Sequence, residues 1–452
     1  MENPHVQVIG CGYVGLTTAL AFASKGITVT GIEVDHKKRE SLSSGKLPFH
    51  EPRLEELLCQ LLGNKFRVRD SPVESDISFI SVGTPSKNDG SIDLAFVESA
   101  SSALGETLKN INGYHTVVVK STLLPGSTER VVIPAIETES QKRVGRDFGM
   151  CVNPEFLREG SALKDMMEPD RVIIGEYDEK SGETLLSLYE SFYAHHSPPI
   201  LRTNIVNAEF IKYASNAFLA TKISFINMVG NIAQRFPGAD VKVIADGMGS
   251  DKRIGKSFLN SGLGYGGSCL SKDLRAFVTL ASGVGYNAKL LSDTEELNES
   301  QFGIAIHEAY NMIGGFDRKT VTILGLSFKP NTDDLREAVS LKIIERLVAE
   351  GAQVKVYDPV VSNSSQIPTF DDGRVVFSKS PIEALQSSDC CILVTEWDEF
   401  RMLEPEDFVQ HMKTPVLVDG RRIYDPAKFD GKMKGFFAMG LGKSAKPSNS
   451  CG

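Results

Sequence analysis

The segment Gly264–Asp273, GYGGSCLSKD, contains residue types that could do covalent chemistry. Cys269 follows three glycines, and Asp273 lies four residues after it. We expect a helix over residues 274–281, so Cys269 would lie at a helix N-terminus, where backbone amides and the helix dipole stabilise a thiolate. A small residue packed in a tight corner is the commoner role of a lone cysteine. The glycines, which could leave room for a ligand, and Asp273 on the same helical face favour the nucleophile.

A long helical pattern runs from about Asn204 to Phe236 and contains Lys212 and Asn216, four residues apart and so separated by roughly 40° on the helix. A solvated helix face would be the usual place for two such polar residues, but the apolar residues around them disfavour it. A helix of this length also predicts a connecting spine and a dimer surface.

The N-terminal residues predict a dinucleotide site that would bring a cofactor to these groups. A short strand at residues 6–9 leads into Gly10-Cys11-Gly12-Tyr13-Val14-Gly15 and then into a helical run and a second strand that ends near Glu33. The glycines permit a tight turn and close approach to a pyrophosphate at a helix N-terminus. Glu33 could accept hydrogen bonds from both ribose hydroxyls and would repel a 2′-phosphate, so we expect NAD rather than NADP.

Further apolar strands are predicted at residues 76–83, 115–122, 149–153 and 171–175. Their polar or glycine-rich ends should surround one crevice, because ligands bind at the carboxyl ends of strands in open α/β sheets. A second α/β unit opens at residues 319–330, where a single Gly325 stands in place of three glycines, and reaches residues 352–359.

The expected fold class is therefore α/β, with domains divided at roughly 1–203, 204–314 and 315–452. The first would be an NAD-binding Rossmann domain, the second a long-helix dimerisation region and the third a Rossmann-like domain. The tail from about residue 443 is expected to be disordered.

Composition excludes several function classes. The 452 residues carry a formal net charge of -9, and no basic run is long enough to attract a nucleic-acid backbone or an anionic membrane. The N-terminus lacks the pattern of a signal peptide, so we expect a cytoplasmic protein. Seven cysteines, an odd number without a CxxC pair, argue against a disulfide framework and against a zinc site, and no metal is expected.

An NAD enzyme that only oxidises an alcohol needs a base but no thiol. A nucleophilic cysteine beside a nicotinamide indicates oxidation at the aldehyde level, through a thiohemiacetal and a thioester that water cleaves.

With these residues in view, the chain resembles the nucleotide-sugar 6-dehydrogenase family from residue 6 to about 430. The motifs that carry the resemblance are Gly10–Gly15, Val82-Gly83-Thr84-Pro85, Lys120-Ser121-Thr122, Asn153–Gly160, Asn216-Ala217, Gly264–Asp273, Gly325–Lys329 and Asp419-Gly420-Arg421. The resemblance implies a four-electron, two-NAD oxidation of a sugar C6 alcohol to an acid, and it implies that the Rossmann-like domain at residues 315–452 binds the nucleotide sugar. It is greatest to the members that use UDP-glucose, and GDP-mannose or a UDP-N-acetylhexosamine are the alternatives.

The resemblance also implies residue roles. Cys269 would be the nucleophile, Lys212 and Asn216 the oxyanion pair, and Asp273 the partner of a water near the C6 hydroxyl. Glu155 would serve thioester hydrolysis, and Thr122 would position water or the nicotinamide; a first-turn acid and a helix N-cap are their structural alternatives. The implied cofactor-binding residues are Gly10, Gly12, Tyr13, Val14, Gly15, Glu33, Lys38, Thr84, Thr122, Glu159 and Lys272. The implied substrate-binding residues are Phe156, Leu157, Arg158, Glu159, Lys212, Asn216, Arg253, Phe258, Leu259, Tyr265, Gly266, Phe328, Lys329 and Arg421. Arg253 would reach the neighbouring subunit's site, which makes a homodimer or higher homo-oligomer the expected state.

The chain departs from the family pattern at Ser271, where proline is usual, at Ala338-Val339, where Ser-Pro is usual, and at Leu270, a residue as typical of GDP-mannose enzymes. Two other functions fit the sequence less well than a nucleotide-sugar dehydrogenase. A non-catalytic regulator that binds NAD and a nucleotide sugar needs no thiol, and a 3-hydroxyacid dehydrogenase accounts neither for Cys269 nor for residues 315–452.

Overall fold

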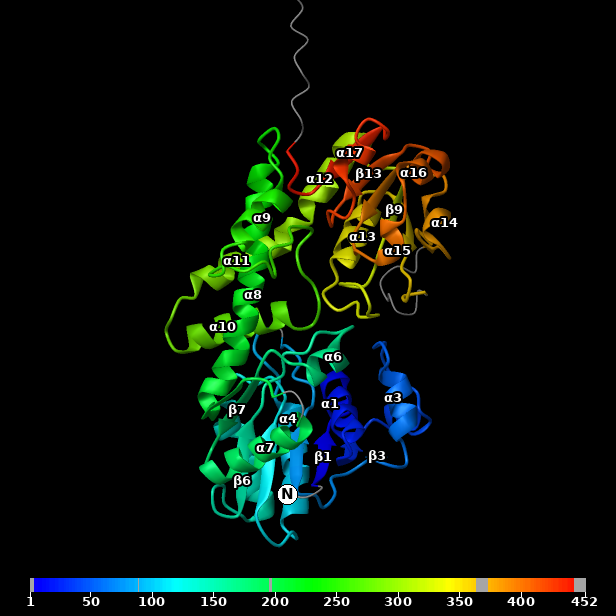
Figure 1. Cartoon of the computed structure of the whole chain (residues 1–452). Helices are drawn as coiled ribbons and strands as arrows, with labels where there is room; N and C mark the ends of the chain where they lie inside the picture. Colours follow the sequence, from blue (N-terminus) through cyan, green and yellow to red (C-terminus); the bar gives the residue numbers. More distant parts are fainter. Residues whose placement is uncertain (1–3, 88, 195–196, 363–372, 443–452) are drawn as a thin grey trace, which may run out of the picture. The chain divides into compact units, whose positions relative to one another are not determined.

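The computed structural model describes residues 4–87, 89–194, 197–362 and 373–442. The chain forms two compact units, Met1–Ser215 with Thr279–Val284, and Asn216–Val278 with Gly285–Gly452. Each unit contains one largely parallel sheet flanked by helices, which confirms the predicted α/β class (Figure 1). The tail predicted from about residue 443 lies outside the described residues. Within the described residues, no helix is long and apolar enough to cross a membrane.

The sheet of the first unit has eight strands in the order β3-β2-β1-β4-β5-β6-β7-β8. Every neighbouring pair is parallel except β6 and β7, which are antiparallel. The sequence analysis did not identify the two edge strands, β3 and β8. The strands are β1 (His5–Ile9), β2 (Thr28–Ile32), β3 (Phe66–Arg69), β4 (Ile77–Ile80), β5 (His115–Val119), β6 (Phe148–Val152), β7 (Val172–Glu176) and β8 (Ile200–Asn204).

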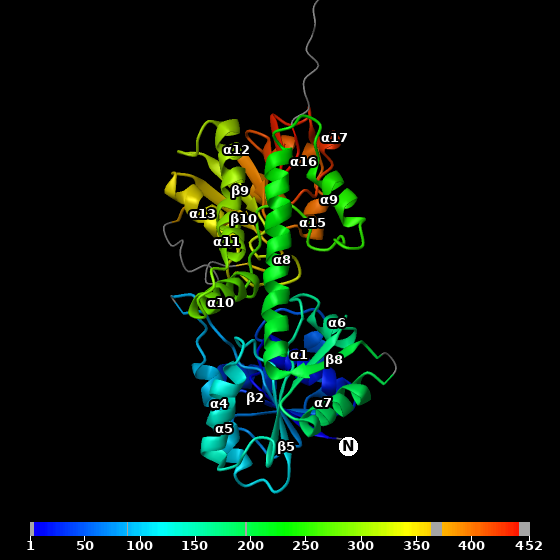
Figure 2. The same ribbon diagram turned by 90° about the vertical axis from the view of Figure 1, so that its left-hand side faces the viewer.

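Helices cover both faces of this sheet. Apolar residues of α1 and α7 form one core with the strands, and those of α4 and α5 form another on the opposite face (Figure 2). The strands are buried on both faces, which explains their continuous apolar sequences. The helices are α1 (Tyr13–Ser24), α2 (His36–Ser43), α3 (Leu54–Leu61), α4 (Ala95–Leu108), the π-helix η1 (Thr128–Val132), α5 (Ile133–Ser140), α6 (Ala162–Met167) and α7 (Glu179–Phe192).

The long helix predicted from about Asn204 to Phe236 is α8 (Ile205–Ala233). Its residues up to Ser215 belong to the first unit and the remainder to the second. The helices that follow in the chain are α9 (Val241–Gly249), α10 (Leu270–Gly283), α11 (Lys289–Gln301) and α12 (Gly303–Ile313).

The sheet of the second unit has the order β11-β10-β9-β12-β13-β14, and all its neighbouring pairs are parallel. Its strands are β9 (Thr320–Leu324), β10 (Gln353–Tyr357), β11 (Val375–Phe377), β12 (Cys390–Leu393), β13 (Val416–Asp419) and β14 (Gly435–Ala438). Its helices are α13 (Val339–Ala349), α14 (Pro381–Leu385), α15 (Asp398–Arg401), α16 (Pro405–His411) and α17 (Pro426–Phe429).

The two sheets begin with the same turn. The amide of Gly10 donates to the last residue of β2, and the amide of Gly325 donates to the last residue of β10, at 2.8 Å in both cases. Both glycines have a positive φ, near 95°. In the second unit, however, the buried carboxylate of Asp358, directly after β10, accepts hydrogen bonds from the amides of Leu326 (2.8 Å) and Ser327 (3.1 Å).

Candidate active site

The loop between β1 and α1 has the geometry of a dinucleotide cradle. Gly10 has φ +95°, and a Cβ there would lie 2.7 Å from the Ser81 carbonyl oxygen. A Cβ on Gly15 would lie 1.9 Å from the Gly10 oxygen, so this position holds the helix close to the turn. A Cβ on Gly12 would meet nothing within 4 Å, and Gly12 is the N-cap of α1 without a side-chain cap. Open space in front of helix amides suits a pyrophosphate, so these residues fit NAD.

Glu33 lies directly after β2 and is buried, and its carboxylate accepts a hydrogen bond from the amide of Asp35 at 2.9 Å. The carboxyl group is therefore fixed at the strand end where a ribose hydroxyl would bind. Of the other predicted cofactor residues in this unit, Thr84 and Val14 are half-buried and Lys38 is exposed on α2.

Tyr13 makes contacts that the sequence analysis did not predict. Its hydroxyl donates to the buried Glu51 and accepts from the amide of Gly160 at 2.8 Å. Glu51 also accepts from the amides of Gly160 (2.6 Å) and Ala162 (2.8 Å). Tyr13 thus connects the dinucleotide loop to the end of the 153–160 loop.

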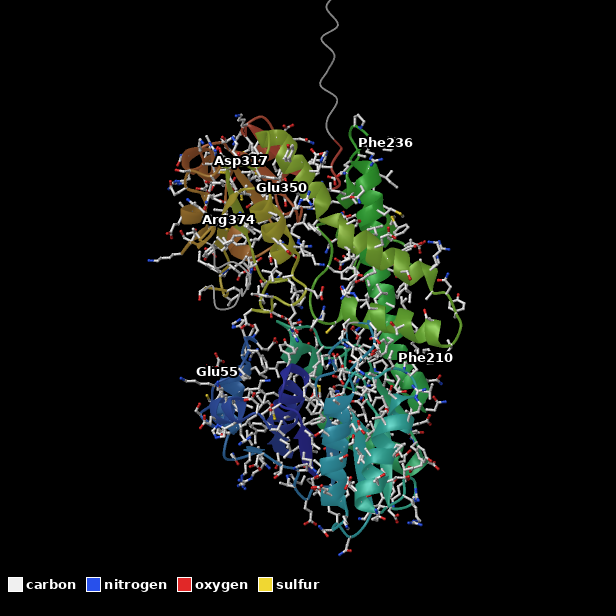
Figure 3. All side chains as sticks on the ribbon, turned by 180° about the vertical axis from the view of Figure 1, so that it is seen from behind. Glu55, Phe210, Phe236, Asp317, Glu350 and Arg374 are labelled. Atoms are coloured by element: carbon white, nitrogen blue, oxygen red, sulfur yellow. The ribbon has the colours of Figure 1, made fainter. Side chains whose placement is uncertain are left out.

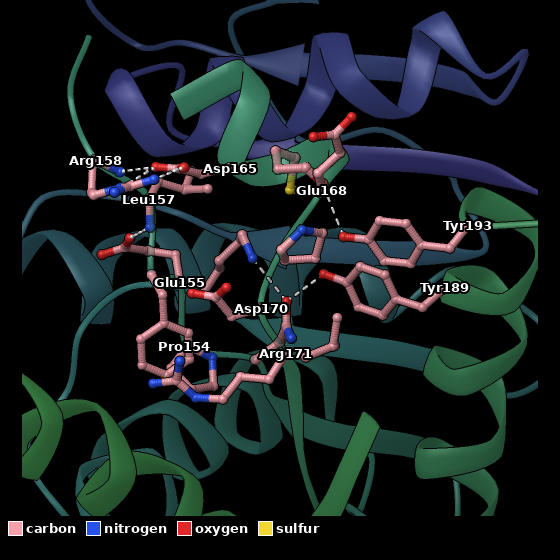
Figure 4. A pocket seen from close by; sticks show the side chains of 16 residues that line it. Pro154, Glu155, Leu157, Arg158, Asp165, Glu168, Asp170, Arg171, Tyr189 and Tyr193 are labelled. Atoms are coloured by element: carbon pink, nitrogen blue, oxygen red, sulfur yellow. Dashed lines mark hydrogen bonds and ion pairs between the residues drawn. The ribbon is translucent and has the colours of Figure 1, made fainter. Parts of the chain in front are cut away.

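Glu155 and Lys212 form a buried ion pair in the first unit. The Lys212 Nζ lies 2.8 Å from both the carbonyl oxygen and Oε1 of Glu155, and both side chains are below 10% exposed. The other carboxylate oxygen accepts from the amide of Leu157 at 2.7 Å (Figure 4). Residues 153–158 have no regular secondary structure, so the alternative of Glu155 as a first-turn helix acid is wrong.

Charge and burial oppose each other at this pair. Burial alone would raise the pKa of Glu155, but the Lys212 ammonium, its hydrogen bond, the Leu157 amide and the charge of Lys120 together lower it. Burial lowers the pKa of Lys120 to about 8, although Glu155 acts in the opposite direction. Glu155 is therefore held as a carboxylate at neutral pH. The nearby Lys120 loses its proton more easily than an ordinary lysine.

Behind the 153–160 loop lies a cavity of about 90 Å³. Asn153 organises its wall, because its Oδ1 accepts from Lys120 Nζ at 2.8 Å and from the Tyr189 hydroxyl at 2.5 Å. Figure 4 shows Tyr189, Tyr193 and Glu168 around it. The cavity is large enough for several waters, which could bind the polar groups of its wall.

Arg158 and Phe156, in the same loop, each contact a charged side chain. Arg158 pairs with Asp165 at 2.6 Å. Phe156 lies under the Arg171 guanidinium, 3.9 Å from the ring centroid. Thr122 is half-buried in the loop between β5 and η1, six residues before η1 begins, so the alternative of a helix N-cap is wrong.

Cys269 directly precedes α10 in the second unit. Its carbonyl oxygen accepts from the amide of Asp273 at 2.9 Å, the first hydrogen bond of the helix. Its side chain is exposed and in no disulfide. The thiol therefore lies at the positive end of a 14-residue helix, which favours the thiolate.

Asp273 is 1% exposed and holds two partners. Its Oδ2 accepts from Asn216 Nδ2 and its Oδ1 from Lys272 Nζ, both at 2.6 Å. Lys272, predicted to bind the cofactor, is thus paired with Asp273. Lys212 and Asn216 lie one turn apart on α8. In this structure Lys212 donates to the carboxylate of Glu155, and Asn216 donates to that of Asp273.

The glycines before Cys269 approach neighbouring parts of the chain closely. A Cβ on Gly266 would lie 2.4 Å from the Glu337 oxygen, and one on Gly267 would lie 2.7 Å from the Phe328 ring. Gly264 approaches Asn298 in the same way, at 2.8 Å. These glycines therefore pack the turn against its own chain, with positive φ at Gly264 and Gly267.

Two basic residues predicted to bind the substrate are held in the second unit. Arg421 Nε donates to the Val394 carbonyl at 2.6 Å, and one of its terminal nitrogens donates to the Gly264 carbonyl at 3.0 Å. Lys329 Nζ lies 5.4 Å from the Phe328 ring centroid. The guanidinium of Arg421 thus braces the strand end and the glycine turn at once.

The other predicted substrate residues are also in the second unit. Leu259 and Tyr265 are buried, and Phe258 has a positive φ of 64°. Asn298 binds the backbone of Tyr265 through its amide and carbonyl. Arg253 is exposed and forms a bidentate pair with Asp251, two residues away. Among the described residues, no group of three His, Cys, Asp or Glu side chains could hold a metal ion.

Sequence reasoning missed three carboxylates that hold these loops: Glu51, Glu209 and Asp358. Each is buried and accepts several backbone amides. An acidic residue inside an apolar stretch, such as Glu209 in the first turns of α8, was the available signal.

Comparison with known proteins finds one family along the chain. The UDP-glucose/GDP-mannose dehydrogenase family matches with its NAD binding domain at residues 4–193, its central domain at 206–300 and its UDP binding domain at 322–426. The chain is 39% identical to the UDP-glucose 6-dehydrogenase AglM of Haloferax volcanii, over 92% of this chain and 96% of that protein. It is 41% identical to a GDP-mannose 6-dehydrogenase of Pseudomonas putida, over 92% and 98%. A UDP-glucose dehydrogenase structure from Pyrobaculum islandicum has a TM-score of 0.88 and 36% identity, covering 97% of this chain and 98% of that one.

Proposed function

Because the chain belongs to the UDP-glucose/GDP-mannose dehydrogenase family, and is an NAD-dependent nucleotide-sugar 6-dehydrogenase, we propose that it oxidises the C6 hydroxyl of UDP-glucose to the carboxylate of UDP-glucuronate. The observation that carries the covalent mechanism is an exposed thiol at a helix N-terminus, one turn before a buried aspartate. We keep the division into domains at about 1–203, 204–314 and 315–452 as part of this proposal.

In the first step, the C6 hydroxyl loses its proton to Asp273 through a water bound to that carboxylate. The Gly10–Gly15 loop and Glu33 would hold NAD, which would supply the hydride acceptor for each of the two oxidations. The product of the first oxidation is an aldehyde, and the Cys269 thiolate adds to its carbon.

This addition forms a C–S bond and places a negative charge on the former aldehyde oxygen. Lys212 and Asn216 stabilise that oxyanion. For this role the Lys212 ammonium, which donates to Glu155 at 2.8 Å, must share its hydrogen bonds with the substrate.

The second oxidation converts the thiohemiacetal into a thioester. Glu155 takes a proton from water, and the hydroxide attacks the thioester carbon. The C–S bond breaks, the thiolate returns to Cys269, and the sugar acid leaves. The pKa of Glu155 is lowered, which keeps the carboxylate unprotonated before it acts but also makes it a weaker base.

We assign the nucleotide sugar to the main chain of residues 156–159, to the 258–266 loop, and to the cations Lys329 and Arg421. Two phosphate charges require fixed cations. Arg421 donates to the Gly264 carbonyl at 3.0 Å, and this contact with the loop supports its assignment as one of these cations.

The thiol is tested by replacing Cys269 with serine. Cys59, a second exposed cysteine on α3, offers the matched control. We expect Cys269→Ser to lose at least about 1,000-fold in UDP-glucuronate release. Cys59→Ser should keep the parental rate. Release of the acid by Cys269→Ser at that rate would exclude the covalent mechanism.

A second candidate substrate is GDP-mannose, which the 41% identity to a GDP-mannose 6-dehydrogenase favours. A panel of UDP-glucose, GDP-mannose and a UDP-N-acetylhexosamine at equal concentration separates the candidates by kcat/KM. We expect two NADH per UDP-glucose consumed. A higher kcat/KM with GDP-mannose would assign the other nucleotide.

We also propose that the protein is a homodimer formed along α8. Its exposed large apolar residues are Phe210 (41%), Phe218 (65%), Phe225 (44%), Met228 (39%) and Ile232 (53%), within an arc of about 80° on one helix face. Figure 3 labels Phe210 near the start of α8 and Phe236 just beyond its end. A stripe of this kind supports an interface between copies. In such a dimer the exposed Arg253 would enter the neighbouring site.

A further inference from the structure

Glu209 binds a catalytic loop that lies far from it in the sequence. It is on α8, one turn before Lys212, and is 2% exposed. Its Oε2 accepts from the Gly126 amide at 2.5 Å. Its Oε1 accepts from the Thr128 amide at 3.0 Å and from the Thr128 hydroxyl at 2.7 Å. Three hydrogen bonds to one carboxylate fix the start of η1 to α8.

The segment held in this way carries Thr122. At its near end, the amides of Lys120 and Ser121 both donate to the Ile80 carbonyl, at 2.8 and 3.0 Å. At its far end, Glu209 holds Gly126, which has a φ of +81°. The four residues from Thr122 to Pro125 therefore lie between two fixed ends, and the second end depends on Glu209.

The helix that provides this anchor is itself fixed. A Cβ on Gly175 of β7 would lie 2.5 Å from the Cβ of Ala208, so α8 packs directly against the sheet backbone. One turn after Glu209, the Lys212 ammonium donates to the backbone carbonyl and to the carboxylate of Glu155. The first turns of α8 thus hold the Thr122 loop through a carboxylate and the Glu155 loop through an ammonium.

We propose that Glu209 is a positioning residue: it aligns the Thr122 loop with the helix that carries Lys212, and acts on the reaction through Thr122. This inference rests on the proposed function of Thr122 and adds a residue that has no contact with the reacting atoms. Small displacements of positioning groups are costly in catalysis, because the reacting atoms must lie within a few tenths of an ångström of their productive geometry.

Burial disfavours the charged form of the Glu209 carboxylate. Desolvation raises the pKa of Glu209, although the hydrogen bonds from Thr128 and Gly126 act to lower it. A neutral side chain of the same shape would fill the space without that cost, so the acceptor pair itself is what the site requires.

The first test replaces Glu209 with glutamine, which has the same shape but presents an NH₂ group to one of the donors. We expect kcat to fall by about 10- to 100-fold, while KM for the nucleotide sugar changes by less than about twofold. Amide exchange at Gly126 should accelerate. Glu190→Gln, an exposed carboxylate on α7, is the matched control and should change neither quantity.

A second pair of variants does not alter the carboxylate. Thr128→Val removes the hydroxyl donor and keeps the shape, and Thr128→Ser keeps the hydroxyl. We expect Thr128→Val to lower kcat in the same direction as Glu209→Gln, and Thr128→Ser to retain at least about half of the parental kcat. Equal kcat values for Val and Ser would overturn the proposal.

The decisive comparison is a double-variant cycle with Thr122→Ala. If Glu209 acts through Thr122, Glu209→Gln should change kcat less than about twofold once Thr122 is alanine. Independent, multiplying losses would overturn the positioning role and leave the proposed function intact. A parental kcat in Thr122→Ala alone would overturn the function assigned to Thr122 and, with it, this inference.

Discussion

Replacing Lys212 with methionine should destabilise the first unit strongly, because it leaves the Glu155 carboxylate buried without its ion-pair partner. Both side chains are below 10% exposed, and Lys212 Nζ donates two hydrogen bonds of 2.8 Å to Glu155. Breaking a buried pair from one side costs about 3–5 kcal/mol. Lys120, whose charge also lowers the pKa of Glu155, remains in place, so we expect about 3 kcal/mol.

Urea unfolding measures this loss. With a denaturant slope of about 3 kcal/mol/M, a loss of about 3 kcal/mol moves the midpoint of the first unit down by about 1 M. The double variant Glu155→Gln with Lys212→Met removes both charges of the pair and should recover most of the shift, because no carboxylate is then buried without its ion-pair partner.

The effect should depend on pH with a defined sign. In the parent the pKa of Glu155 is lowered, so its contribution to stability is present above the unfolded pKa of about 4.3 and is lost as pH falls through the lower folded pKa. In Lys212→Met, burial would raise that pKa, and the penalty of the buried charge would decrease as pH falls through it. The difference between parent and variant should therefore be larger at pH 7.5 than at pH 5.

Two results would refute this reasoning. One is a midpoint shift below about 0.3 M for Lys212→Met at pH 7.5, which corresponds to a surface-like pair of less than about 1 kcal/mol. The other is a double variant at least as unstable as Lys212→Met alone, which would show that the loss comes from packing and not from the charge.

The dinucleotide loop, a buried lysine and the α8 stripe give three further predictions. Gly12→Ala should weaken NAD binding by at least about tenfold in calorimetry at unchanged stability, because its Cβ enters open space, whereas Gly15→Ala, whose Cβ would lie 1.9 Å from the Gly10 oxygen, should lower both; equal unfolding midpoints for the two variants would contradict this. The pKa of Lys120 is lowered to about 8, so between pH 8 and about 10.4 the unfolded chain binds more protons, and parental stability in urea should rise with pH relative to Lys120→Met; a pH-independent difference would exclude the shifted pKa. Phe225→Asp places a charge in the stripe and should convert dimers to monomers in light scattering, and a parent that is monomeric, or a variant that remains dimeric, would exclude this interface.

The parts of this structure that local sequence patterns encode were predictable. The glycine spacing of Gly10–Gly15 predicted the turn, the cradle and Glu33 at the next strand end, because chain geometry alone fixes these positions. The apolar periodicity of residues 204–236 gave α8 to within three residues. Cys269 lies at the start of a helix, as expected from its apolar continuation.

The parts that depend on distant partners were not predictable. Pro154 suggested a helix start at Glu155, but the carboxylate is held by Lys212, 57 residues away, and by the Leu157 amide, which keep the segment irregular. The glycines before Cys269 suggested space for a ligand, but the sequence did not show that a side chain on Gly267 would meet Phe328, from a loop about 60 residues away. A single sequence shows periodicity and turn residues, and long-range pairing is absent from both.

Asp358 has a consequence for how the two halves of the chain recognise anions. It follows β10 as Glu33 follows β2, but it turns back and binds the amides of Leu326 and Ser327 itself. Because these two amides already donate to the Asp358 carboxylate, they are not available to bind a phosphate. A nucleotide bound by the second half would therefore rely on cationic side chains at this turn, whereas in the first half the amides at the start of α1 are open to a phosphate.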